Sequence, residues 1–127
     1  MKAKCHRLFL PLLLAFTCAA HVENEIGSEY AKADVQPVKV ERVANNRIRI
    51  AYRIPPETLW YSGGVNYLAQ NDVLKIAIDK CPYNKSCNPM AVGHQSRSDF
   101  WAGDVTLPYR GERVLMVYSD VEELVYP

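Results

Sequence analysis

The chain has 127 residues, of which 15 are Lys or Arg and 14 are Asp or Glu, so its formal charge is +1. This length suits one domain, and the near-neutral balance argues against a protein that binds nucleic acid through excess positive charge. Hydrophobic residues make up 49% of the chain and charged residues 23%, which is the composition of a folded protein rather than a disordered one.

The first twenty residues predict a secretory signal peptide. Lys2, Lys4 and Arg7 form a basic start, and an apolar run over 8–16 leads to small residues that end at Ala20. The run is shorter than the roughly 20 apolar residues that a membrane-spanning helix needs. We therefore expect an exported protein, periplasmic or extracellular, without a membrane span. The remaining 107 residues carry 12 basic and 14 acidic side chains, so neither nucleic acid nor anionic lipid is an expected partner.

The cleavage site decides the N-terminus of the mature protein. A cut after Ala20 leaves His21 as the first residue. A lipoprotein anchored at Cys18 is the alternative, which is disfavoured because Thr17 stands where a smaller residue is expected and Phe16 is bulky beside it.

Beyond the signal peptide, residues 21–34 are polar and lack periodicity, which predicts a flexible N-terminal arm. Residues 35–127 then form a single domain of strands. The strongest signal is a period of two over 47–54, and Asn45-Asn46 before it predicts the turn of a hairpin. The positions that alternate to one face are Ile48, Ile50, Tyr52 and Ile54.

Further short strands are expected between turn residues along the rest of the chain. They cover 65–68, 73–79, 105–107, 113–118 and 121–126, with a long irregular connection over 80–103. About seven short antiparallel strands and no convincing helix predict an all-β, immunoglobulin-like β-sandwich, with a small β-barrel as the alternative.

Cys81 and Cys87 are the two cysteines outside the signal peptide, and in an exported chain such a pair predicts a disulfide. Closing a ring of about seven residues stabilises a protein by roughly 2 kcal/mol, so the bridge is expected to hold a loop rather than the whole domain. The same loop contains a glycosylation sequon at Asn84, which has meaning only in a eukaryotic secretory host.

A copper site is one candidate for chemistry. If His21 becomes the first residue, its amine and imidazole, together with His94, supply the three nitrogens of a histidine brace. Copper(II) favours nitrogen ligands in tetragonal geometry. The competing interpretation is that His21 merely flanks a cleavage site and that His94 is an ordinary loop residue. No other cofactor is indicated, and no catalytic motif is present.

Aromatic residues in or beside the predicted loops are candidates for binding. Exposed Trp and Tyr are favoured at protein interfaces because they combine apolar area with a polar tip. The residues are Trp60, Tyr61, Tyr83, Phe100 and Trp101.

The expected function is therefore binding rather than catalysis. We expect a module that recognises another protein through the 80–103 connection, as an inhibitor or immunity protein does. Two alternatives remain: the copper-binding protein, and a structural subunit that pairs with others through its C-terminal strand.

Overall fold

The structure is a computed structural model that describes Ile26 and residues 30–127. The predicted signal peptide, Cys18, His21 and most of the predicted arm lie outside the described residues. Over those residues the fold is all-β, as the sequence predicts, with a single short 3-10 helix, η1, at Lys32–Asp34.

Seven strands of the described region have five residues or more, in agreement with the expected number. They are β1 (Lys39–Ala44), β2 (Arg47–Arg53), β4 (Gly64–Gln70), β5 (Val73–Ile78), β9 (Ala102–Pro108), β10 (Arg113–Val117) and β11 (Glu122–Tyr126). Four strands of two residues accompany them: β3 (Trp60–Tyr61), β6 (Cys81–Pro82), β7 (Ala91–Val92) and β8 (His94–Gln95).

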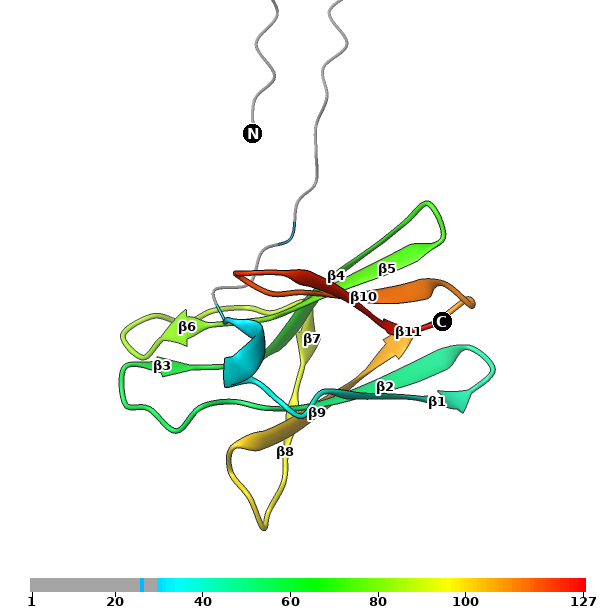
Figure 1. The fold of residues 1–127 in the computed structure, drawn as a ribbon. Helices are drawn as coiled ribbons and strands as arrows, with labels where there is room; N and C mark the ends of the chain where they lie inside the picture. The colour runs from blue at the N-terminus through cyan, green and yellow to red at the C-terminus, as the bar shows by residue number, and fades with distance from the viewer. Residues whose placement is uncertain (1–25, 27–29) are drawn as a thin grey trace, which may run out of the picture.

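The strands form two main sheets packed face to face, as Figure 1 shows. One sheet has the order β1-β2-β9-β8 and the other the order β11-β10-β5-β4-β7, while β3 and β6 form a small pair beside them. Both main sheets keep open edges, so the described strands make a sandwich and not the closed barrel that was the alternative.

The core lies between the sheets and follows the alternation seen in the sequence. The inward residues of β2 are buried while the intervening arginines are not, because successive side chains of a strand point to opposite faces. Fully buried residues of the neighbouring strand β9 and of the facing sheet complete it: Val105 and Leu107 on β9, and Val65, Leu74, Ile76, Ile78, Val114 and Met116 opposite.

The strand pairing confirms the predicted hairpin and adds a second one. The β1–β2 hairpin is antiparallel, with Lys39 opposite Ala51, and the chain turns at 45–46. Residues Asn71 and Asp72 have φ angles of 53° and 60°, a conformation that Asn and Asp tolerate better than most residues, and they join β4 to β5.

One pair departs from the antiparallel pattern, since β5 and β10 run parallel, with Val73 opposite Arg113. Parallel neighbours need a long connection between them. Here the chain leaves β5, passes through the 80–103 connection and β9 of the other sheet, and then returns. This crossover carries the 80–103 connection along one end of the sandwich.

The predicted flexible arm requires correction at its C-terminal end. Tyr30 is 1% exposed and belongs to the core, and its carbonyl accepts a hydrogen bond from Ser119 N–H at 2.9 Å. Lys32 forms an ion pair with Glu123 on β11. Residues 30–34 therefore pack against the domain. Burying the ring of Tyr30 removes apolar area from water, and this favourable free energy offsets the conformational entropy that the segment loses when it becomes ordered.

Candidate binding site

The chain passes from one main sheet to the other between β7 and β8. β7 pairs with β4 in the five-stranded sheet, and β8 pairs with β9 in the four-stranded sheet. Gly93 stands between them, and its N–H donates a hydrogen bond to the carbonyl of Gly63 at 2.8 Å. β7 and β8 are both edge strands, so the two sheets are open to a partner here (Figure 1).

An open cleft of about 300 Å³ lies at this crossing. It is built from the end of β2, the β3–β4 connection, the β7–β8 crossing and the start of β9. The lining residues are Tyr52, Ile54, Tyr61, Ser62, Gly63, Val92, Gly93, His94, Gln95, Phe100, Trp101, Ala102 and Gly103.

Tyr52 closes the cleft on its core side. A Cβ atom on Gly93 would lie 2.8 Å from the Tyr52 hydroxyl, and one on Gly103 would lie 3.2 Å from its ring. The two glycines thus leave room for the ring of Tyr52, which is 5% exposed. A methyl group at Gly93 would therefore force the Tyr52 hydroxyl to shift, and one at Gly103 would crowd the ring.

Burial also sets the charge state of Tyr52. Desolvation raises the pKa of its hydroxyl to about 12, while a hydrogen bond with Ser62 acts in the opposite direction. At neutral pH the hydroxyl therefore stays protonated and neutral, and it can both donate and accept a hydrogen bond.

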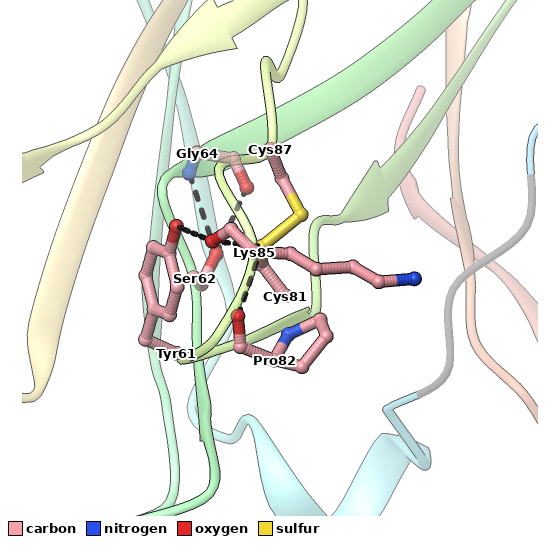
Figure 2. Close-up of a disulfide and its surroundings, with 7 residues drawn as sticks. All are labelled: Tyr61, Ser62, Gly64, Cys81, Pro82, Lys85 and Cys87. Carbon is pink, nitrogen blue, oxygen red and sulfur yellow. Dashed lines mark hydrogen bonds between the residues drawn. A yellow bond between two sulfur atoms is a disulfide. The ribbon is translucent and has the colours of Figure 1, made fainter.

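Tyr61 forms one wall of the cleft and is held by the disulfide loop (Figure 2). The predicted bond between Cys81 and Cys87 is present, with the two Cα atoms 6.0 Å apart. Within the loop that it closes, the carbonyl of Lys85 accepts a hydrogen bond from the Tyr61 hydroxyl at 3.2 Å. The disulfide thus fixes the acceptor that orients the ring of Tyr61.

Phe100 and Trp101 also line the cleft, and Asp99 supports the backbone at Trp101. Its carboxylate accepts a hydrogen bond from the Trp101 backbone N–H at 3.1 Å and also pairs with the guanidinium of Arg53. The Arg53 hydrogen bond is the main reason that the pKa of Asp99 lies below its ordinary value. The rings of Phe100 and Trp101 meet edge to face, with centroids 5.0 Å apart.

The five aromatic residues predicted to bind are divided between two places. Tyr61, Phe100 and Trp101 line the cleft, whereas Trp60 and Tyr83 line a shallow depression beside β3. The two places adjoin, since the ring centroids of Tyr61 and Tyr83 are 5.1 Å apart. Adjacent residues of a strand point to opposite faces, so Trp60 and Tyr61 separate. The ring of Trp60 lies 5.0 Å from the ammonium group of Lys80 instead.

The predicted copper ligands are not brought together by the described residues. His94 is exposed on β8, and His21 lies outside the described part of the chain. Among Ile26 and residues 30–127, no group of three His, Cys, Asp or Glu side chains is placed to hold a metal ion. The brace stays a prediction from the sequence.

Sequence reasoning missed Tyr52, Ser62 and the two glycines as parts of the site. The alternation places Tyr52 among the inward core residues, and its hydroxyl in a row of isoleucines is the one signal of a further role. The partnership of Gly93 and Gly103 depends on strand pairing that no local pattern reveals.

A scan against protein-family models and searches of curated proteins and of solved structures found no match to this chain. Within the residues that the structure describes, no helix has the length and apolar character needed to cross a membrane.

Proposed function

We propose that the chain is a small exported binding module that recognises another protein through the 80–103 connection, in the manner of an inhibitor or immunity protein. One observation carries the proposal. Half of the large hydrophobic side chains that are exposed in the described region belong to this connection: Tyr83, Met90, Val92 and Phe100.

Exposed apolar side chains that gather at one place on the surface are characteristic of a contact surface. Val92 is 73% exposed and Phe100 is 55% exposed, and both line the cleft. The scaffold below them is ordered by the disulfide and by Asp99. A segment that is already ordered loses less conformational entropy on binding, which favours affinity.

The test is photo-crosslinking in the cells that make the protein. A benzoylphenylalanine is introduced in place of Phe100 and, as the matched control, in place of Val43, which is 48% exposed on β1 at another edge. We expect one dominant covalent adduct with another protein at position 100 and none at position 43. Equal labelling at both positions, or no adduct at position 100, would overturn the proposal.

A second candidate is a structural role in which copies or partners pair with the C-terminal strand. The observation that favours it is that β11 is an edge strand of the five-stranded sheet and exposes Leu124. A Lys on an edge strand opposes pairing with another chain. If this role is correct, Leu124→Lys lowers the mass measured by light scattering to that of one chain. An unchanged monomer mass in both proteins rules out self-assembly through β11.

A further inference from the structure

The lining of the cleft carries no formal charge. It contains no Lys, Arg, Asp or Glu side chain. A charged group that entered would lose its hydration without gaining an ion partner, which costs several kcal/mol. The group that the cleft accepts is therefore uncharged.

The size and the walls of the cleft suit an aromatic ring. Its volume of about 300 Å³ is at the lower end for ligand sites, enough for one large side chain rather than an extended ligand. Tyr61 and the edge-to-face pair of Phe100 and Trp101 all line it. Aromatic rings bind further rings in tilted or offset arrangements at such walls.

Polar groups at the cleft favour a ring with a polar tip. The neutral hydroxyl of Tyr52 lies on the core side, and His94 and Gln95 lie on β8. A buried indole N–H or phenol O–H needs a hydrogen-bond partner, and these groups provide several.

From these observations we infer that the cleft receives one Trp or Tyr side chain of the partner protein. The inference rests on the proposed function and specifies the chemistry of the partner. The ring lies against the aromatic side chains that line the cleft, and its polar tip reaches the hydroxyl of Tyr52 or the groups on β8.

The first experiment needs no knowledge of the partner. The isotope-labelled domain is titrated with N-acetyl-tryptophanamide, with N-acetyl-lysinamide, and with methyl glucoside as a neutral sugar. We expect saturable NMR shifts with the tryptophan amide alone, confined to Gly93, Phe100, Trp101 and Gly103. Shifts with the sugar but not with the aromatic amide, or no saturable shift, would overturn the inference.

Two variants give the control. Phe100→Ala weakens binding of the tryptophan amide at least tenfold, whereas Leu124→Ala, at a similarly exposed position on β11, leaves it unchanged. Equal affinity in all three proteins places the probe elsewhere and contradicts the inference. If the crosslink at position 100 forms while the aromatic amide does not bind, the proposed function survives and the inference fails.

Discussion

Asp99 is the side chain on which the position of Trp101 depends. We expect Asp99→Asn to lose the ion pair with Arg53 while keeping one acceptor for the Trp101 N–H. The tip of the 95–102 loop then loses part of its support, and affinity at the cleft falls several-fold. Titration with N-acetyl-tryptophanamide measures the affinity, and an unaltered value contradicts the role given to Asp99. Asp34→Asn, at an exposed carboxylate of η1, is the control.

The same residue makes the cleft sensitive to acid. Arg53 lowers the pKa of Asp99 in the folded protein, so this stabilisation is present above the ordinary aspartate pKa of about 3.9. It is lost as the pH falls through the lowered pKa. We expect the NMR signal of the Trp101 indole to shift below about pH 4 in the wild type. The shift is expected to be absent in Asp99→Asn, and an identical shift in both proteins contradicts this assignment.

Gly63 and Gly64 are neighbours, but only Gly63 has room for a Cβ atom. A Cβ on Gly64 would lie 1.9 Å from the carbonyl oxygen of Ala91, and its φ of 151° is one that other residues rarely adopt. We expect Gly64→Ala to lower the free energy of unfolding by about 3 kcal/mol. Gly63→Ala, with its nearest contact at 3.4 Å, changes it by less than about 1 kcal/mol. Urea unfolding of both variants measures these two changes in the free energy of unfolding. Equal losses in Gly63→Ala and Gly64→Ala contradict the prediction.

At the scale of elements, the disulfide loop supports the site more than the fold. Replacing Cys81 and Cys87 by Ser together is expected to lower the free energy of unfolding by about 2 kcal/mol, because the ring is small. Without the disulfide, the loop is no longer held in one conformation, so the Lys85 carbonyl no longer orients the Tyr61 hydroxyl. Affinity for the aromatic probe therefore falls while the sandwich stays folded. Circular dichroism and the NMR titration measure the two effects, and unfolding at 25 °C contradicts this division.

The strands that could be predicted from the sequence are those with strong alternation. β2 and β5 follow this pattern, because one face of each strand packs on the core. Within 80–103, the strands β6, β7 and β8 have two residues each, which is too short for any periodicity. The disulfide could be predicted from cysteine number and compartment, whereas the cleft could not, since it depends on how β2, β4 and β9 meet.

Taken as a whole molecule, the two sheets share one core and are expected to unfold together. Ile76 of β5 is fully buried, so Ile76→Ala lowers the free energy of unfolding by about 2–5 kcal/mol. Val43→Ala, at an exposed site, changes it by less than about 0.5 kcal/mol. Near-ultraviolet and far-ultraviolet circular dichroism follow the same transition in urea. Separate midpoints for the two signals contradict a single cooperative core.

The anchors of the cleft walls have a consequence for protein engineering. The Tyr61 hydroxyl bonds to the main-chain carbonyl of residue 85, and Asp99 bonds to the main-chain N–H of Trp101. Neither contact is made by the side chains at 84–86 or 96–98, which are exposed. A library randomised at these six positions keeps the aromatic walls in place while it alters their surroundings, so selection from it can redirect the domain to new targets.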